Sequence, residues 1–232
     1  MDAPIIEIFS SIQGEGLLIG ERQIFVRFAG CNLDCSYCDT KNSQSANVGT
    51  MMSVNQVLDE IKKLRTDDLG SISYTGGEPM LHADFIAELI NKTEEKSLLE
   101  TNGTLPNELT KLEGLDWASM DIKLPEHFDG SWSDDILENE ISFIKLLIEQ
   151  DTNLYCKLVV LPSTKISTVE KVIKRVSDSI PENVEVPLVI QPASPLELWE
   201  GNSEKLFEFS EVAGKYMKVL TIPQIHKFLN IE

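Results

Sequence analysis

Three of the four cysteines in this chain, Cys31, Cys35 and Cys38, lie within one short segment. This CxxxCxxC spacing places three soft thiolates on one loop, an odd number that suits an iron–sulfur cluster better than a closed four-ligand zinc site. Three thiolates can hold three irons of a [4Fe-4S] cube, which leaves the fourth iron open to a small-molecule ligand. The triplet therefore predicts a metal centre where chemistry takes place.

A zinc knuckle completed by a distant histidine or aspartate is the alternative reading of the triplet. The sequence offers it little support, because it contains neither a second CxxC pair nor a His-x3-5-His pair, and His82, His127 and His226 are scattered. The fourth cysteine, Cys156, lies in the apolar run Leu-Tyr-Cys-Lys-Leu-Val-Val. We expect it to be a small buried hydrophobic residue rather than a ligand.

A second motif, Thr75-Gly76-Gly77-Glu78-Pro79, follows a predicted strand. Two consecutive glycines let the backbone approach a ligand closely and donate its amide groups. Alone, this segment reads as an ordinary tight turn. It becomes informative because the cysteine triplet comes one strand–helix unit earlier.

Strands and helices alternate along the chain, as the spacing of apolar residues indicates. The predicted strands are 23–28, 71–75, 97–101, 117–122, 154–161 and 187–191, and the predicted helices are 54–64 with Ser53 as its cap, 84–95, 107–112, 137–150 and 169–179. A polar stretch from Pro125 to Asp135 reads as an inserted loop. Six such units predict an α/β fold with parallel strands, either a partial (β/α)6 TIM-like barrel or an open sheet.

Both architectures place their sites at the carboxyl ends of the strands. The cysteines, Gly76-Gly77, Asn102-Gly103, Lys123 and Gln191-Pro192 each follow a predicted strand, so we expect them to converge on one rim. We find no linker that would split the chain, and expect one domain.

The composition limits the possible partners. With 38 acidic and 20 basic residues among 232, the formal net charge of -18 would repel a polyanion, so we expect no binding to nucleic acid. The sequence has no secretion signal at its start and no apolar run long enough for a membrane helix. Clustered, reduced thiols complete the expectation of a cytoplasmic protein that does not bind membranes.

The two motifs together, CxxxCxxC with an aromatic residue before its last cysteine and Gly-Gly-Glu-Pro, resemble the radical S-adenosylmethionine superfamily. Within it, the segments Phe9–Gly16, Phe25–Leu33, Cys38–Thr40 and Gln224–Lys227 resemble the 7-carboxy-7-deazaguanine synthase family. The resemblance implies a single radical S-adenosylmethionine domain over residues 1–232, with an N-terminal substrate-binding segment and a C-terminal extension.

The resemblance also implies an activity. Members of that family are lyases that use a radical derived from S-adenosylmethionine to contract the ring of 6-carboxy-5,6,7,8-tetrahydropterin, with loss of ammonia, in queuosine and archaeosine biosynthesis. The implied cofactors are a [4Fe-4S] cluster, S-adenosylmethionine and Mg²⁺, and the implied partners are an electron donor such as flavodoxin or ferredoxin and a second copy of the chain as a homodimer. No side chain is expected to be catalytic, because the cofactor carries the chemistry.

Site residues carry over where the motifs match. The resemblance implies cluster ligands Cys31, Cys35 and Cys38, a magnesium contact at Thr40, S-adenosylmethionine contacts at Tyr37, Cys38, Asp39, Gly77, Glu78, Asp121, Ile122, Lys123, Gln191, Pro192, Ala193 and Ser194, and substrate contacts at Ile12, Gln13, Gly14, Glu15, Arg27, Thr75 and His226. Gln13 can donate and accept hydrogen bonds toward a heterocycle, and the planar fork of Arg27 matches a carboxylate.

Two other functions stay open from sequence alone: a glycyl-radical enzyme activase, which uses the same cysteine spacing on a protein substrate, and a non-catalytic metal-stabilised binding module. Two departures from the family are also visible. Asp121-Ile122-Lys123 stands where many relatives have Ser-Pro-Lys, and the chain continues to Glu232 where some relatives end in a proline carboxylate close to the substrate.

Overall fold

The computed structural model describes residues 1–130 and 132–231. Its strands are β1 (Asp2–Ile12), β2 (Arg22–Phe28), β3 (Thr50–Ser53), β4 (Leu69–Gly76), β5 (Ser97–Thr101), β6 (Trp117–Ile122), β7 (Asn153–Val160), β8 (Leu188–Pro192) and β9 (Val219–Thr221). Its α-helices are α1 (Val54–Leu64), α2 (Ala83–Lys92), α3 (Pro106–Leu109), α4 (Asp134–Glu149), α5 (Ile166–Ser177), α6 (Glu204–Ala213) and α7 (Ile225–Leu229), and its 3-10 helices are η1 (Lys41–Gln44), η2 (Pro79–His82), η3 (Pro125–His127) and η4 (Leu196–Trp199).

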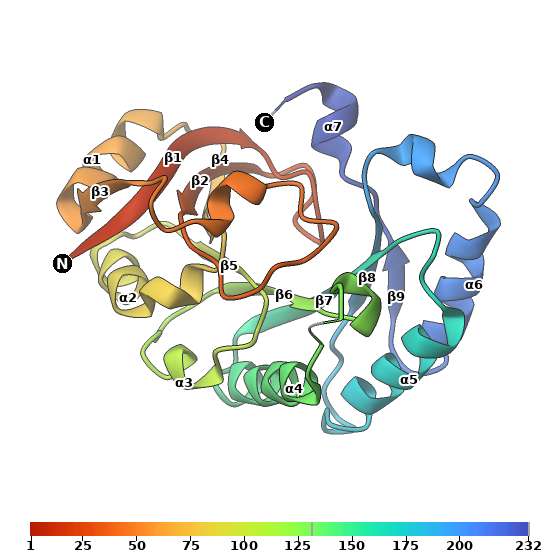
Figure 1. Cartoon of the computed structure of the whole chain (residues 1–232). Helices are drawn as coiled ribbons and strands as arrows, with labels where there is room; N and C mark the ends of the chain where they lie inside the picture. Colours follow the sequence, from red (N-terminus) through yellow and green to blue (C-terminus); the bar gives the residue numbers. More distant parts are fainter. Residues whose placement is uncertain (131, 232) are drawn as a thin grey trace.

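These strands form one nine-stranded sheet in the order β3-β1-β2-β4-β5-β6-β7-β8-β9. From β2 onward every neighbouring pair is parallel. The sheet curves and helices α1 to α6 cover its outer face (Figure 1). Because β3 and β9 form opposite edges of the described sheet, the barrel stays open. The predicted α/β partial barrel with parallel strands is thus confirmed, and all six predicted strands belong to it.

The strand formed by the N-terminal segment was not predicted from the sequence. Residues Asp2–Ile12 form β1, which is antiparallel to both β2 and β3. Its alternation is hard to read, because Pro4 interrupts it and the register with β2 shifts between Ile5 and Glu7. The described sheet therefore has an antiparallel margin beside the predicted parallel strands.

Local capping explains where two helices begin. Ser53 caps α1 as predicted: its hydroxyl accepts from the Gln56 amide and the Gln56 side chain accepts from the Ser53 amide. Helix α4 begins at Asp134, three residues before the predicted Leu137, because the Ser133 hydroxyl accepts from the Asp135 amide. The predicted loop from Pro125 to Asp135 thus contains η3 and the start of α4, and Ser131 within it lies outside the described residues.

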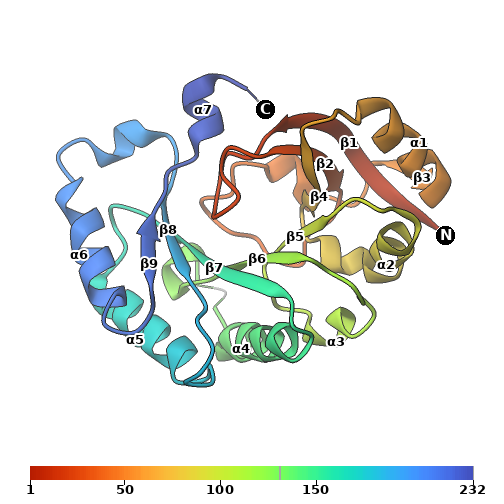
Figure 2. The same cartoon turned by 180° about the vertical axis from the view of Figure 1, so that it is seen from behind.

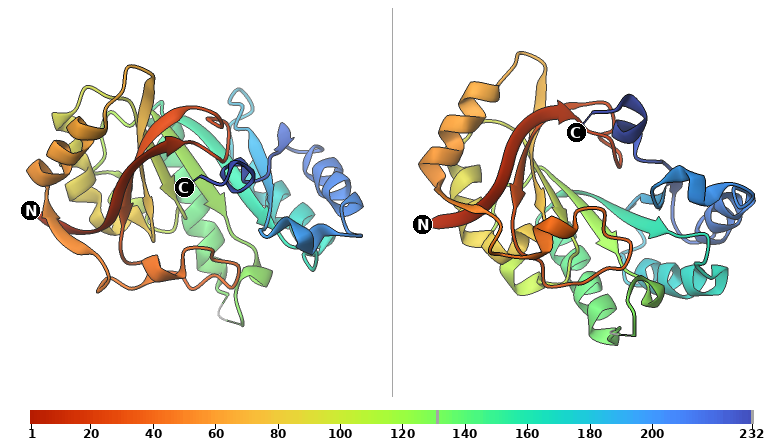
Figure 3. Two further views of the ribbon diagram at one scale, coloured as in Figure 1. Left: turned by 90° about the horizontal axis from the view of Figure 1, so that it is seen from above. Right: turned by 45° about the horizontal axis from the view of Figure 1, so that its top comes forward.

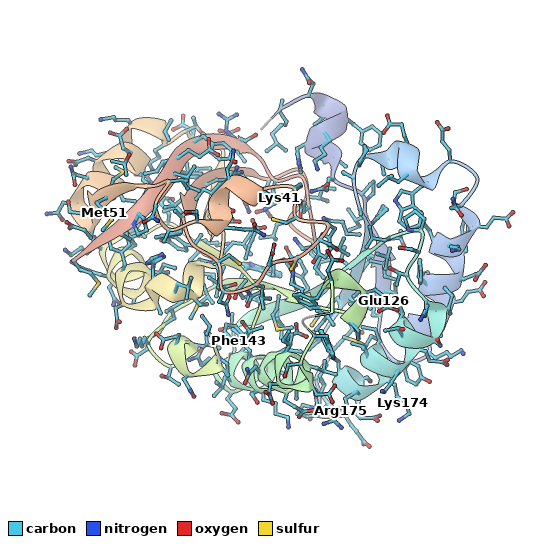
Figure 4. All side chains as sticks on the ribbon, viewed as in Figure 1. Lys41, Met51, Glu126, Phe143, Lys174 and Arg175 are labelled. Atoms are coloured by element: carbon cyan, nitrogen blue, oxygen red, sulfur yellow. The ribbon has the colours of Figure 1, made fainter. Side chains whose placement is uncertain are left out.

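The core lies between the sheet and its outer helices. Phe143 on α4 is fully buried there, whereas Lys174 and Arg175 point outward from α5, as Figure 4 shows. Both outward-facing residues form ion pairs, Lys174 with Asp178 and Arg175 with Glu138. Within the described residues, no helix combines the length and the apolar character that crossing a membrane requires.

The C-terminal helix α7 lies apart from the outer helix layer. It stands between the two sides of the open barrel, close to the turn that follows β1 (Figures 2 and 3). The Ile225 amide donates to the Gly14 carbonyl oxygen at 2.9 Å, so this proximity is a bonded contact. The C-terminal helix therefore contacts the turn that joins β1 to β2.

Candidate active site

Two adjoining cavities lie at the carboxyl ends of the parallel strands. The first, of about 180 Å³, is lined by Cys31, Cys35 and Cys38 among others, and we call it the cysteine-side cavity. The second, of about 310 Å³, is lined by Arg27 and His226 among others, and we call it the substrate-side cavity. Six residues line both: Glu15, Asp39, Thr40, Thr75, Gly76 and Glu100. The two cavities therefore share a wall.

The cysteine loop follows β2 and folds back on itself. The Gly30 amide donates to the Ser43 carbonyl oxygen at 2.7 Å and the Cys31 amide to the Gln44 carbonyl oxygen at 3.1 Å, which closes the loop through η1. Farther along, the Asn32 side chain donates to Thr104 at 2.7 Å and accepts from Asn102 at 2.9 Å. These contacts anchor the loop to the end of β5.

The three thiols fit an iron–sulfur cluster by chemistry and by placement. Burial raises the pKa of Cys31, and raises that of Cys35 to about 11, so these two thiols stay protonated until a metal draws off their protons. No three described His, Cys, Asp or Glu side chains are gathered tightly enough to hold one ion. A cluster places each thiolate on a different iron and needs no such convergence. The fourth cysteine, Cys156, is fully buried in β7 and does not line either cavity.

The two glycines after β4 are required by the neighbouring backbone. Gly76 has a φ of +123°, and a Cβ there would lie 2.2 Å from the Phe28 carbonyl oxygen, while a Cβ on Gly77 would lie 2.0 Å from that of Gly30. The amides of Gly77 and Glu78 donate to these same carbonyls at 3.0 and 2.7 Å. The glycine motif and the cysteine loop are therefore bonded together where β2 and β4 end.

Glu78 lies behind the cavity wall. It is fully buried, lines neither cavity, and accepts hydrogen bonds from the Thr101 hydroxyl at 2.7 Å and from the amides of Asn102 and Met80 at 2.8 and 2.9 Å. Burial raises the pKa of Glu78 to about 7 against these three donors, which lower it. Through these hydrogen bonds, Glu78 links the segments at the ends of β4 and β5.

A chain of buried charges forms one wall of the cysteine-side cavity. The Lys123 ammonium contacts Asp121 at 2.8 Å and the Tyr37 hydroxyl at 2.9 Å, and Lys157 contacts Glu15 at 2.6 Å and Asp121 at 3.4 Å. Burial alone would lower the pKa of Lys157, but Asp121 and Glu15 outweigh it and hold that pKa well above its ordinary value. Lys123, Asp121, Lys157 and Glu15 are charged and the Tyr37 hydroxyl is polar, so this wall of the cavity is strongly polar.

The β1–β2 ribbon forms the floor of the substrate-side cavity. Glu7 lies directly opposite Arg27 and Phe9 directly opposite Phe25 in the register of the two strands. Arg27 binds Glu7 through Nη1 at 2.8 Å and lies over the Phe9 ring, which stacks on Phe25 with a centroid distance of 5.0 Å. These contacts hold the Arg27 guanidinium against the ribbon, with its Nε and Nη2 unbonded to any described residue.

Polar groups from the turn after β1 and from β5 meet in the shared wall. The Gln13 amide donates to Gln23 at 2.9 Å and to Glu100 at 3.2 Å, and its oxygen accepts from the Glu15 amide at 3.0 Å. Burial raises the pKa of Glu100. Burial also raises that of Glu15, but Lys157 outweighs it and the net pKa of Glu15 is lowered. The wall thus places a carboxyl whose pKa is raised beside one whose pKa is lowered.

Most of the residues carried over from the family converge here. Ile12, Gln13, Gly14, Glu15, Arg27, Thr75 and His226 line the substrate-side cavity, and Tyr37, Cys38, Asp39, Gly77, Asp121 and Lys123 line the cysteine-side one. Glu78, Ile122, Gln191, Pro192, Ala193 and Ser194 line neither. Glu7, Glu100 and Lys157 are lining residues that sequence reasoning missed. Lys157 had a visible signal, a lone charge in an apolar strand like that of Arg27.

Comparison with known proteins identifies the family of this chain. A family model described as the Radical SAM superfamily matches residues 25–189. The 7-carboxy-7-deazaguanine synthase of Methanothermobacter thermautotrophicus is 47% identical over 243 aligned residues, covering 100% of this chain and 98% of that protein. The protein of the same name from Methanocaldococcus jannaschii is 38% identical, with 98% and 99% covered.

Two solved structures share the fold. The crystal structure of QueE from Escherichia coli superimposes with a TM-score of 0.63 at 19% identity, covering 95% of this chain and 94% of that chain. The structure of TYW1 with a lysine-pyruvate adduct bound gives 0.59 at 12% identity, with 84% and 74% covered. Membership of the superfamily implies a [4Fe-4S] cluster and S-adenosylmethionine, for which the three thiols of the cysteine-side cavity are suited. With near-complete coverage at 47% identity, this chain belongs to the 7-carboxy-7-deazaguanine synthase family of the radical S-adenosylmethionine superfamily.

Proposed function

We propose that this protein converts 6-carboxy-5,6,7,8-tetrahydropterin to 7-carboxy-7-deazaguanine and ammonia, as a single radical S-adenosylmethionine domain. The observation that carries the proposal is the wall shared by the two cavities, with thiols on one side and Arg27 and His226 on the other. When bound, the cluster and S-adenosylmethionine supply a radical that takes a hydrogen atom from C6 of the substrate. A substrate bound in the substrate-side cavity therefore lies directly beside the cysteine-side cavity.

The substrate's carboxylate binds Arg27 in this proposal. Glu7 occupies only Nη1 of that guanidinium, so Nε and Nη2 are left for two parallel hydrogen bonds to a carboxylate. The guanidine-like edge of the pterin meets Gln13, Glu15 and Thr75, and His226 closes the cavity from α7. Binding in this way fixes the orientation of the pterin in the cavity.

The cofactor contacts are proposals of the same kind. Cys31, Cys35 and Cys38 hold the cluster, while S-adenosylmethionine binds among Tyr37, Asp39, Gly77, Asp121 and Lys123. Behind them lie Ile122, the last two residues of β8, Gln191 and Pro192, and the following Ala193 and Ser194. We further propose that Thr40 binds Mg²⁺ together with the substrate carboxylate. Its hydroxyl lies in the shared wall and contacts Asp39 at 3.0 Å, and hard oxygen ligands of this type suit magnesium.

The proposal includes two partners. The cluster needs one electron for each cleavage of S-adenosylmethionine, for which we propose a flavodoxin or a ferredoxin as donor. We also propose a homodimer, which analytical ultracentrifugation of the loaded protein would test. A monomer at micromolar concentration would overturn that part alone.

An anaerobic assay tests the proposed reaction. The reconstituted protein is incubated with the pterin, S-adenosylmethionine, Mg²⁺ and a reductant, and 7-carboxy-7-deazaguanine is sought by mass spectrometry. The expected result is product formed with ammonia, lowered when Mg²⁺ is replaced by a chelator. Cleavage of S-adenosylmethionine that never consumes the pterin would overturn the substrate assignment.

A further inference from the structure

Gln224, which precedes α7, is buried among three segments that are distant in the sequence. Its side chain is only 7% exposed, and lines neither cavity. Its Nε2 donates to Glu15 Oε1 at 2.6 Å and to Asp39 Oδ2 at 3.0 Å, while its Oε1 accepts from the Ser194 hydroxyl at 2.5 Å. One amide thus joins the turn after β1, the cysteine loop and the end of β8.

The chemistry of the partners fixes the orientation of this amide. Ionised carboxylates only accept hydrogen bonds, so the nitrogen of Gln224 must face Glu15 and Asp39. A hydroxyl can donate, so the oxygen must face Ser194. Both amide protons and the carbonyl oxygen are therefore satisfied, and the opposite orientation would set an oxygen against two carboxylates.

The two carboxylates need such a donor between them because they repel each other. Each has its own lysine on the outer side, Lys157 at 2.6 Å from Glu15 and Lys227 at 2.9 Å from Asp39. Between them, Gln224 supplies the only donor that contacts both among the described residues. Removing it leaves two like charges facing each other in a partly buried place.

The position of these carboxylates gives the contact its functional meaning. Glu15 and Asp39 both belong to the wall shared by the two cavities. Asp39 is flanked in the chain by Cys38 and Thr40, and Glu15 follows Gly14, against which the His226 side chain packs. The distance between these loops sets the distance between whatever occupies the two cavities.

We propose that Gln224 is a positioning residue: by fastening the loop of Glu15 to the loop of Asp39, it fixes the substrate relative to the cofactor. The inference rests on the proposed function for its kinetic consequence. Gln224 lines neither cavity itself, so it acts through the carboxylates of Glu15 and Asp39. Replacing Gln224 should leave cleavage of S-adenosylmethionine on the cysteine side possible, while the pterin is no longer correctly placed relative to the cofactor.

Two variants of the full-length holoenzyme test this, Gln224→Met, which removes the hydrogen bonds, and Gln224→Glu, which adds a third carboxylate. Both should retain the visible absorption of the cluster. We expect the KM for the pterin to rise roughly 10-fold or more, as loss of a hydrogen bond to a charged group implies. We also expect fewer products per S-adenosylmethionine cleaved, with Gln224→Glu the more severe variant.

Hydrogen exchange of the same proteins, without substrate, gives a readout that needs no turnover. Amide exchange should rise in residues 225–231 and in residues 38–44, and stay unchanged in β6. The matched control is Gln150→Glu, which adds the same charge at the exposed end of α4, where the side chain has one contact of 3.4 Å to the Leu109 carbonyl oxygen. It should behave as the unmodified protein in every measurement.

A double variant sharpens the test. If Gln224 acts by separating two carboxylates, the penalty of Gln224→Glu should be several-fold smaller when Asp39→Asn is also present. Should Gln224→Glu fail to fold, Gln224→Met decides by the same measurements.

The failures of the two proposals are distinguishable. An unmodified protein that never consumes the pterin sinks the proposed function, while the exchange experiment still decides the role of Gln224. Variants with unchanged KM, unchanged coupling and unchanged exchange at both loops overturn the positioning role.

Discussion

The two cavities share a wall, yet they are assembled in opposite ways. The cysteine-side cavity is built from the ends of neighbouring parallel strands, and its lining runs from Glu15 to Lys157. The substrate-side cavity is built largely from the first and last parts of the chain, the β1–β2 ribbon and the residues His226 and Lys227. One side is thus local to the sheet, and the other needs both chain ends.

The bonds that join the glycine motif to the cysteine loop differ in kind from those that hold the substrate side. On the cysteine side, backbone amides of Gly77 and Glu78 donate to backbone carbonyls of the adjacent strand. On the substrate side, single charged side chains meet across long sequence separations, as in Lys227 with Asp39. Backbone bonds survive most side-chain substitutions, whereas a charge pair depends on each partner. The junction of the glycine motif with the cysteine loop should therefore tolerate side-chain variation, and the substrate side should be sensitive at single residues.

The largest effect is expected for the cluster ligands. Replacing Cys35 by serine should reduce bound iron and bring product formation to background, because three thiolates are needed for the cube. Iron analysis and the anaerobic assay measure this, with Cys156→Ala as the control that keeps its iron. The comparison predicts that Cys35→Ser still binds the pterin in a calorimeter. Loss of that binding would show that the two sides are not independent.

Arg27→Met should produce the reverse pattern. We expect the KM for the pterin to rise roughly 10- to 100-fold, because hydrogen bonds to a charged group contribute about 1.5–3 kcal/mol. Cleavage of S-adenosylmethionine without product should persist. Arg22→Met, on the same ribbon but bound to Ser10 outside both cavities, is the matched control. Equal losses in both variants would assign the effect to the ribbon rather than to the guanidinium.

Acid should weaken the cysteine side through His127. Its Nδ1 accepts from the Leu124 amide, so Nε2 carries the proton and donates to the Val159 carbonyl oxygen at 2.9 Å. Burial lowers the pKa of His127 from 6.5 to about 3. The unfolded chain therefore binds the proton first, and stability is complete above pH 6.5 and falls as the pH drops toward 3.

Between pH 6.5 and 5 this loss should approach about 2 kcal/mol in the free energy of unfolding. Urea titrations at both pH values measure it, and the His127→Gln variant should show a shallower dependence on pH over this interval. The His127 ring lies 4.6 Å from the Tyr37 ring and its carbonyl oxygen accepts from Ser36, so exchange at the cysteine loop should rise before exchange at α7. A pH slope equal in both proteins would contradict this account.

The smallest effect is expected at Gly14. A Cβ there would lie 2.1 Å from His226 Nδ1, so Gly14→Ala must push α7 outward at a cost of about 1 kcal/mol. The KM for the pterin should rise several-fold while the cluster stays intact. Gly70→Ala, whose added Cβ meets the movable carboxylate end of Glu21 at 3.0 Å, is the control. An unchanged KM would mean that His226 does not close the substrate-side cavity.

This contrast also explains what could be predicted from sequence. The cysteine side could be predicted because its motifs are contiguous in the sequence. They are Cys31 to Cys38 and Gly76 to Glu78, and each follows the end of a predicted strand. The parallel strands carry apolar runs that identify them. Even so, the glycines turned out to be required by the backbone of the cysteine loop, and Glu78 to lie behind the cavity wall.

The substrate side was less predictable because its contacts are long-range and electrostatic. Nothing in the local sequence pairs Glu7 with Arg27 or Gln224 with Asp39, since those contacts exist only once β1 is antiparallel to β2 and α7 has packed against the turn after β1. Without the strand assignment of β1, Glu7 could not be placed opposite Arg27. The resemblance supplied residue roles there, and the fold supplied the partners that hold them.

The position of α7 at the end of the chain also fixes an order of events during synthesis. Every residue that lines the cysteine-side cavity has been added once Lys157 is in the chain, whereas His226 and Lys227 are still to come. At ribosomal rates of about 5–20 residues per second, that interval lasts roughly several seconds. The three cysteines therefore exist before the substrate-side cavity can be completed, so under the proposed function the nascent chain offers its cluster ligands earlier than its substrate contacts.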